Sequence, residues 1–191
     1  MKLKLITAPN KILKTKSTEV KEFDNNLKDI MNQMLDIMYD NNGIGLAANQ
    51  VGLSIRLLVL DLGDEYLDDG SFIKNNDDDE LNNIKNNITY PIFMVNPVVF
   101  YKSSKQESCK EGCLSLPGQE IDVMRASEIK VSYVDYFGKE KKIYAKNLLA
   151  RAIQHEIDHI DGVVLIDYLS KLKKDMTLKK LIKIQKANKS L

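Results

Sequence analysis

The segment QHEIDH at 154–159 constrains the fold of this chain more than any other feature of its sequence. It contains the pattern HExxH, and on an α-helix the side chains of His155 and His159 lie one turn apart on the same face. Two imidazoles at this spacing can bind one metal ion, and Glu156 lies beside them, within reach of the water that such an ion activates. A chance spacing of two core histidines is the alternative, and it is disfavoured because the chain contains no other histidine. We therefore expect a metal-binding helix at this position.

Two histidines do not complete a catalytic metal site, which usually takes three protein ligands and leaves one position for water. The ligand that common HExxH proteases place downstream is missing, because no Glu follows Glu156 and no His follows His159. Cys113, in EGCLS at 111–115, is the simplest upstream candidate, since a thiolate binds soft and borderline ions strongly. A nucleophilic role for Cys113 would need a base while both histidines are committed, and an inert buried thiol is the other alternative. One thiolate and two imidazoles suit zinc, iron(II), nickel or cobalt.

Composition is that of an ordinary soluble globular protein. The 191 residues suit one domain with one sizeable core, and 43% of them are hydrophobic and 29% charged. The net charge of +1 implies no particular partner for the molecule as a whole. No apolar run approaches the ~20 residues that span a bilayer, and the first apolar stretch is too short for a signal peptide. We expect a cytoplasmic protein without a membrane segment, and a monomer by default.

Apolar spacing predicts three helices and one short helical turn. The expected ranges are 9–16 with Pro9 in the first turn, 24–41 capped by Asp24, 148–160 capped by Asn147 and ended by Gly162, and a last helix from about Ser170. Three methionines of the second range fall on one helical face, so we interpret them as core: Met31, Met34 and Met38.

Strands are predicted between these helices, at 55–60, at 92–101 with an edge or a bulge at Pro97, and in a hairpin of 128–135 and 139–146 with its turn at Phe137 and Gly138. No βαβ repeat is present. The expected fold is therefore α+β, with mostly antiparallel sheets packed around a central metal-binding helix and with an N-terminal and a C-terminal helix. We expect a single domain at 1–170, with an acidic Asn/Asp-rich insertion loop at 63–89, followed by a basic amphipathic helix at 171–191.

Three segments of this sequence, GIGLAANQ at 43–50, EGCLS at 111–115 and QHEIDH at 154–159, resemble the three signature motifs of the peptide deformylase family, in the family's order and at similar spacing. The resemblance covers about residues 5–170 and is greatest for bacterial-type members that end in a C-terminal helix. It implies a metal-dependent hydrolase that removes the formyl group from the N-terminal formylmethionine of nascent polypeptides and releases formate. It also implies iron(II) as the native ion, with zinc, nickel or cobalt as alternatives.

The resemblance further implies a role for each residue that matches the family motifs. The metal ligands would be Cys113, His155 and His159. Glu156 would act as general base and acid, and the oxyanion would be bound by Gln50 and the backbone N–H of Leu114. A substrate lying as an added strand would receive backbone hydrogen bonds from Ile44, Gly45 and Gly112. The cysteine loop would be supported by an ion pair of Glu111 with Arg125. The substrate pocket would be bordered by Cys109, Leu148 and Arg151.

Three residues depart from the family pattern near the expected site. Cys109 stands where an apolar residue is usual, and a small thiol there either widens the pocket or fills it. Glu120 stands where Arg is frequent, near the mouth of the site. Arg151 stands where an apolar residue is common, although its stem can line a pocket while its charge reaches water. These departures affect the expected substrate preference and not the reaction.

The remaining features bear on two alternative functions and on one candidate binding partner. A general zinc endopeptidase is disfavoured by the missing downstream ligand, and a non-catalytic ribosome binder would need neither Glu156 nor Gln50. The segment 171–191 contains eight lysines and a single acidic residue, Asp175. A solvated helix packed on the domain would explain this composition, and so would attraction to ribosomal RNA. The family resemblance favours contact with the ribosome through this helix.

Overall fold

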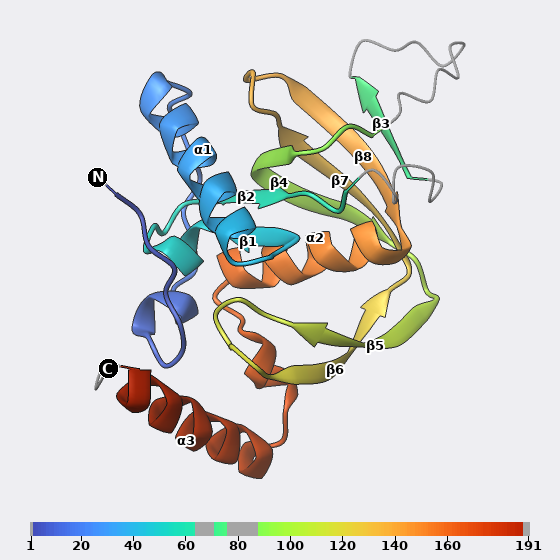
Figure 1. Ribbon diagram of the computed structural model, residues 1–191. Helices are drawn as coiled ribbons and strands as arrows, with labels where there is room; N and C mark the ends of the chain where they lie inside the picture. Colours follow the sequence, from blue (N-terminus) through green and yellow to red (C-terminus); the bar gives the residue numbers. More distant parts are fainter. Residues whose placement is uncertain (1, 64–70, 76–87, 189–191) are drawn as a thin grey trace.

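The computed structural model describes residues 2–63, 71–75 and 88–188 (Figure 1). Its helical elements are η1 (Lys11–Lys14), α1 (Asn25–Asp40), η2 (Ala48–Val51), α2 (Asn147–Ile160), η4 (Leu165–Tyr168) and α3 (Lys171–Asn188). Its strands are β1 (Gly45–Ala47), β2 (Leu57–Leu60), β3 (Phe72–Asn75), β4 (Ile92–Lys102), β5 (Gln106–Gly112), β6 (Glu120–Ala126), β7 (Glu128–Val134) and β8 (Glu140–Lys146). None of the described helices combines the length and the apolarity that crossing a bilayer requires.

The strands form two antiparallel sheets, which confirms the predicted α+β class. Six strands pair in the order β1-β2-β4-β7-β8-β3, and β5 pairs with β6 alone. The expected hairpin is present, because β7 and β8 pair in continuous register and Gly138 has a φ of +79° in the connecting turn. Pro97 lies within an interior strand at a register shift between Val95 and Val98, so it marks a bulge rather than an edge.

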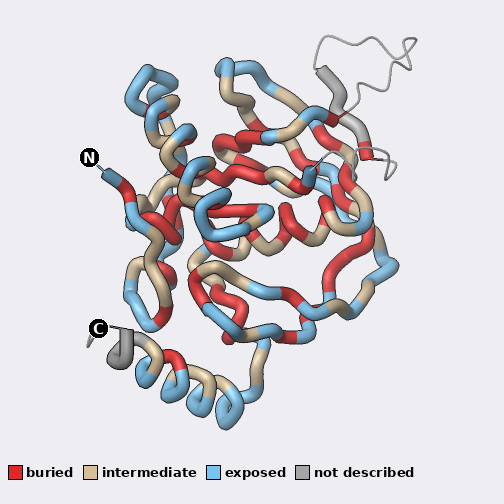
Figure 2. Tube along the Cα trace, viewed as in Figure 1, coloured by how far each residue is buried: buried red, intermediate tan, exposed pale blue. Residues whose placement is uncertain are grey.

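The two long helices of the domain cover opposite faces of the six-stranded sheet. Side chains alternate between the two faces of β2. Leu58 belongs to a hydrophobic cluster that includes residues of α2, and Leu57 belongs to a second cluster that includes residues of α1. The methionines predicted as core are at most 1% exposed and fill the second cluster: Met31, Met34 and Met38. The β5–β6 pair lies on the far side of α2, which therefore runs between the two sheets (Figure 1). Figure 2 shows this helix and the inner strands as the most buried part of the chain.

The start of α1 and the end of α2 agree with their sequence signals. The carboxylate of Asp24 accepts a hydrogen bond from the N–H of Leu27 at 2.8 Å, as an N-cap does. At the end of α2, Gly162 has a φ of +78° and donates its N–H to the carbonyl of His159 at 2.9 Å. This glycine is required for a second reason, because an added Cβ would lie 2.7 Å from the carbonyl oxygen of Lys14.

Two predicted helix starts are wrong. Pro9 precedes the first helical turn instead of opening it, because Asn10 is the N-cap and its side chain accepts from the N–H of Ile12 at 3.1 Å. Asn147 does not cap α2, because Lys146 holds the extended cap position and Asn147 is already the first helical residue, with a φ of +49°. Asparagine tolerates this left-handed conformation better than most residues, which explains its presence at the junction.

The C-terminal helix begins where predicted, but its apolar residues do not share one buried side. Leu181 is 1% exposed in a cluster with the N-terminal segment and η4, whereas Leu172 and Met176 are 72% and 63% exposed. Only some of the apolar residues of α3 therefore pack on the domain, and the amphipathic character expected of 171–191 stays a prediction. The predicted insertion at 63–89 lies mostly outside the described residues. Within it, Phe72–Asn75 forms an edge strand on β8 that the sequence did not predict, and Ile88 is buried.

Candidate active site

Cys113, His155 and His159 come together although the cysteine lies far from the histidines in sequence. Cys113 directly follows β5, and both histidines project from one face of α2. The Sγ of Cys113 lies 3.2 Å from the Nε2 of His159, and one donor atom from each of the three residues lies within 4.8 Å of the others. A tetrahedral ion with bond lengths of about 2.3 Å to sulfur and 2.1 Å to nitrogen separates those two atoms by about 3.6 Å. The three residues therefore fit a single divalent ion.

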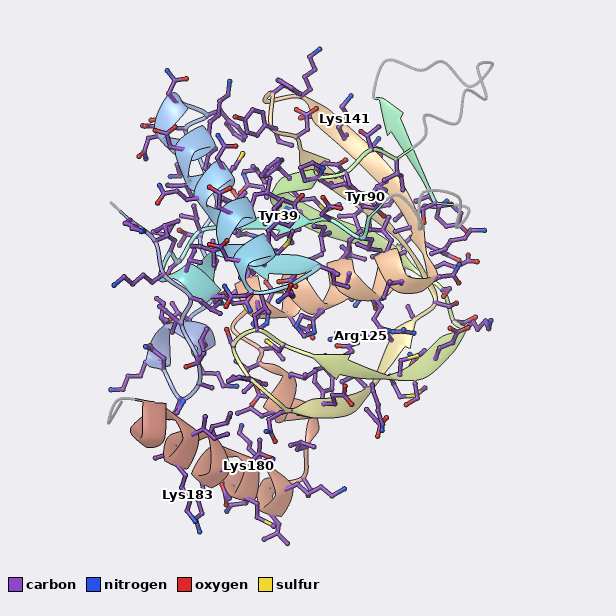
Figure 3. The ribbon with its side chains drawn as sticks, viewed as in Figure 1. Tyr39, Tyr90, Arg125, Lys141, Lys180 and Lys183 are labelled. Atoms are coloured by element: carbon purple, nitrogen blue, oxygen red, sulfur yellow. The ribbon has the colours of Figure 1, made fainter. Side chains whose placement is uncertain are left out.

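A buried network of charges fixes the orientation of His155. The Nδ1–H of His155 donates to the Oε2 of Glu111 at 2.9 Å, which leaves Nε2 as the ring atom available to a metal. Arg125 donates to both oxygens of Glu111 at 2.9 Å through Nε and Nη2. Its Nη1 donates to Asp158 at 2.6 Å and to the hydroxyl of Tyr168 at 3.2 Å. Arg125 thus joins β5, β6 and α2 from a position between them (Figure 3).

The charged state of Glu111 follows from these contacts. Burial raises the pKa of a carboxyl group, but the hydrogen bonds from Arg125 and His155 outweigh this effect and lower the pKa of Glu111 to about 2. Glu111 is therefore ionised at neutral pH although it is only 6% exposed. Its negative charge accepts the hydrogen bond from the Nδ1–H of His155 and increases the basicity of the nitrogen that would bind a metal.

Glu156 has a different environment from Glu111. It is 4% exposed, and among the described residues its Oε2 has no hydrogen-bond partner. Burial is the main reason that the pKa of Glu156 is raised to about 7. The carboxylate stands against Gly45, where an added Cβ would come within 3.0 Å of its Cδ. Glycine at position 45 is therefore what leaves room for this carboxylate beside the two histidines.

Gln50 is held so that its amide group points toward Cys113. Its Oε1 accepts the N–H of Ala47 at 2.8 Å, which fixes the side-chain amide, and the residue is 1% exposed. Its Nε2 lies 3.7 Å from the Sγ of Cys113 and 3.2 Å from the Oγ of Ser115. In the part of the chain that the structure describes, no atom accepts a hydrogen bond from the N–H of Leu114. The amide of Gln50, which donates to Cys113 and Ser115, and the N–H of Leu114 thus lie beside the three ligand residues.

A cavity of about 450 Å³ opens at this cluster between two strand edges. Strand β1 ends the six-stranded sheet and β5 pairs only with β6, so each has one edge without a strand partner among the described residues. Most of the predicted site residues line the cavity: Ile44, Gly45, Gln50, Glu111, Gly112, Cys113, Leu114, Leu148, Arg151, His155 and Glu156. Glu120 lines it as well. His159 and Arg125 lie behind this surface, buried at 1% and 6% exposure.

Cys109 is the exception among the predicted site residues. It lies opposite Val123 in the register of β5 and β6, four positions before Cys113, and it is absent from the cavity lining. The expected border contact of Cys109 with the substrate pocket therefore stays a prediction. The part of β5 that reaches the cavity begins only at Lys110.

Sequence reasoning missed several residues that support the site. Asn49 donates to the backbone carbonyl of His159, and Ser115 donates to the carbonyl of Ile6 at 2.8 Å, so both tie the ligand segments to their neighbours. Asp158 forms a second ion pair with Arg125. Asn49 and Ser115 belong to the motif segments GIGLAANQ and EGCLS, and Asp158 to QHEIDH. Their position next to predicted site residues could have identified them from the sequence.

Comparison with known proteins agrees with this geometry. The model of a family described as polypeptide deformylase matches residues 2–175. The chain belongs to the peptide deformylase family. Members of this family are metal-dependent hydrolases that remove the N-formyl group from nascent peptides, and this chain carries the Cys–His–His group for the metal.

The relatives are similar over almost their whole length. The peptide deformylase of Orientia tsutsugamushi (strain Boryong) is 48% identical over 97% of this chain and 96% of that protein. The peptide deformylase of Rickettsia akari is 43% identical over 96% of each chain. Among solved structures, the peptide deformylase of Ehrlichia chaffeensis superposes with a TM-score of 0.83 at 36% identity, over 97% of this chain and 98% of that one.

Replacement of Arg125 by methionine tests the buried network. It leaves the carboxylate of Glu111 buried without its cationic partner, so we expect the free energy of unfolding to fall by about 3–5 kcal/mol. Weaker orientation of His155 should also reduce metal affinity by about 10- to 100-fold. Urea denaturation and metal titration measure the two effects. Arg56→Met, at a more exposed ion pair with Asp161, is the matched control and should have a smaller effect on both quantities. Equal effects of the two substitutions would contradict this account.

Replacement of Gly45 by alanine tests the position of Glu156. The added methyl group must displace the carboxylate, so we expect the rate of turnover to fall by about 100-fold while metal content and melting temperature stay close to those of the wild type. Gly112→Ala adds the same group on the opposite wall of the cavity, where it meets no atom within 4 Å, and should reduce turnover less. The account is wrong if both variants lose activity to the same extent.

Proposed function

We propose that this chain performs the reaction of its family with Cys113, His155 and His159 as metal ligands and Glu156 as the group that transfers protons. The observation that carries this proposal is the convergence of three ligand atoms within 4.8 Å beside a buried carboxylate that lacks a hydrogen-bond partner among the described residues. The substrate would be the formyl amide at the N-terminus of a new polypeptide, and the products formate and a free amino group.

A divalent ion held by the three ligand atoms supplies Lewis acidity, which brings the pKa of a water molecule toward neutrality. We propose iron(II) as the native ion on the basis of the family resemblance, with zinc, nickel and cobalt as ions that the same donors accept. These residues would hold the ion at the wall of the cavity, because Cys113 and His155 line it while His159 is buried behind them.

The proton transfers fall to Glu156. Its carboxylate lines the cavity next to His155, so it reaches a water molecule placed between the ligands and the substrate. It accepts a proton as this water attacks the formyl carbon and donates the proton to the nitrogen of the leaving amine. Both transfers occur in a site from which bulk water is largely excluded, as the 4% exposure of Glu156 indicates.

Negative charge develops on the formyl oxygen during the attack, and two donors can bind it. The Nε2 of Gln50 is oriented toward the cluster by the hydrogen bond of its Oε1 with Ala47. The backbone N–H of Leu114 is available from the loop that follows β5. One such donor typically contributes about 3–4 kcal/mol to transition-state stabilisation. The assignment of this role to Gln50 and Leu114 is part of the proposal.

The peptide would lie between the free edges of β1 and β5 as an added strand. Ile44 and Gly45 offer backbone groups on one side, and Gly112 offers them on the other, where no side chain obstructs approach. The side chain of the first residue would then extend along α2, over Leu148 and Ala152, which line the cavity before His155. An added strand contributes main-chain hydrogen bonds, so this arrangement accepts peptides of many sequences after the first residue.

We also propose that the protein acts in the cytoplasm as a monomer and that α3 contacts the ribosome. The support for the ribosome contact is the charge and exposure of this helix, on which Lys179, Lys180 and Lys183 are all exposed. Figure 3 labels Lys180 and Lys183 on it. Lysines on one helix neutralise phosphates of ribosomal RNA and release counterions.

Replacement of Glu156 tests the proposed chemistry. Wild-type protein should release formate from a formyl-methionyl peptide, and Glu156→Ala should lower the rate by about 10²- to 10⁴-fold, as expected for a lost general base. Glu156→Gln, which keeps the shape of the side chain, is the matched variant and should lose activity to a similar extent. Metal analysis of all three proteins, purified without oxygen, should show one ion per chain and identifies the ion. Activity of either variant within a few-fold of the wild type would rule out this role.

Charge reversal on α3 tests the ribosome contact without removing the buried Leu181. Replacement of Lys179, Lys180 and Lys183 by glutamate should weaken ribosome binding by at least about tenfold, because each lost phosphate contact reduces the counterion release that drives binding. Formate release from a short peptide should stay unchanged, since this helix does not line the cavity. The same charge change at three lysines of the β7–β8 hairpin, Lys130, Lys139 and Lys142, is the control. Co-sedimentation in which both triple variants bind like the wild type would refute the contact.

A further inference from the structure

Arg151 places a positive charge at the wall of the cavity, where it interacts electrostatically with Glu107 on β5. It lines the cavity on α2 together with Leu148 and Ala152. The Nε of Arg151 is buried, and within the described residues it has no hydrogen-bond partner. The guanidinium also makes no ion pair within the ranges that the structure describes. A buried N–H without an acceptor is unfavourable, so this atom is free to bind an acceptor that enters the cavity with a ligand.

The position of Arg151 determines which part of a substrate it would meet. Arg151 precedes His155 by four residues, so the two side chains lie on one face of α2, separated by about 6 Å along the helix axis. With the formyl group at the ligand cluster, as the proposed function requires, the side chain of the first residue extends along this face. Its CH₂ groups would contact Leu148 and Ala152, and its far end would come near Arg151.

The chemistry of the two partners then decides what binds well. An arginine side chain only donates hydrogen bonds, and the thioether sulfur of methionine is a weak acceptor. Oxidation of methionine to the sulfoxide adds a polar oxygen at this position of the side chain. A sulfoxide oxygen is a strong acceptor, so it can accept the hydrogen bond that a thioether cannot. The sulfoxide oxygen would accept a hydrogen bond from Arg151, whereas a wholly apolar pocket would leave this oxygen without a hydrogen-bond partner.

We propose that Arg151 is a specificity-determining residue that allows this chain to act on peptides that begin with formyl-methionine sulfoxide. The inference rests on the proposed function and extends it to a second substrate class. Arg151 would donate from Nε to the sulfoxide oxygen, with Leu148 and Ala152 holding the aliphatic part of the same side chain. Chains whose first residue was oxidised before processing would then still lose the formyl group.

The test compares three formylated peptides that differ only in the first residue: methionine, methionine sulfoxide and norleucine. For each, kcat/KM is measured by formate release with the wild type and with Arg151→Leu. We expect the ratio of the sulfoxide to the methionine peptide to fall about tenfold in the variant, as the loss of one hydrogen bond to a charged donor predicts. The ratio of the norleucine to the methionine peptide should change less than twofold. Lys139→Leu, which removes a positive charge from an exposed turn, should leave all ratios unchanged.

Further measurements separate failure of this inference from failure of the proposed function. Equilibrium binding of N-acetylated peptides that begin with methionine or its sulfoxide needs no turnover and should show the same loss of preference in Arg151→Leu. Arg151→Met, a second good helix former, serves if the leucine variant does not fold. A sulfoxide preference that changes less than twofold in both assays would overturn the role of Arg151. Absence of formate release from every peptide by the wild type, with the binding preference intact, would overturn the proposed reaction alone.

Discussion

The carboxylate of Glu111 is the point at which the separate parts of this molecule are joined. It lies at the end of β5, accepts two hydrogen bonds from Arg125 on β6, and accepts a third from His155 on α2. Because Arg125 is also bound to Asp158, each of the three charges in this group has an ion-pair partner. The orientation of one metal-binding ring therefore depends on a β-strand that contributes no ligand. Loss of any side chain of this network would disturb both the packing of the β5–β6 sheet on α2 and the geometry of the site.

The carboxylate of Glu156, unlike that of Glu111, lacks a full set of hydrogen-bond partners among the described residues. Its carboxylate is as buried as that of Glu111, yet among the described residues one of its oxygens has no partner. A buried polar group in this state reduces stability, and natural sequences tolerate such conflicts mainly where function requires them. The neighbouring Gly45 keeps the space open, and the core on the other faces of α2 holds the helix in place. The unfavourable burial of Glu156 is thus offset by the packing of α2 in the core.

The sequence predicted those features that depend on local chemistry. Asp24 caps α1, Gly162 ends α2 and the methionines of α1 are buried, because each follows from short-range backbone or packing rules. The Cys–His–His cluster was predictable for a different reason, since few residue types bind metals and the chain has few of them. Asn147 was predicted wrongly as a cap, because its junction with β8 is set by tertiary contacts.

Strands β1 and β5 each leave one edge without a strand partner among the described residues, and β1 is only three residues long. A long free edge invites other chains to pair with it, whereas so short an edge offers few main-chain groups and cannot support an extended intermolecular sheet. The gap between the two strands therefore has room for the first few residues of one chain and for little beyond them. The proposed binding of a peptide between these strands would use groups common to all polypeptides, which suits an enzyme that acts on nascent peptides of many sequences. It also confines that treatment to chain ends, because a folded segment cannot thread into the gap.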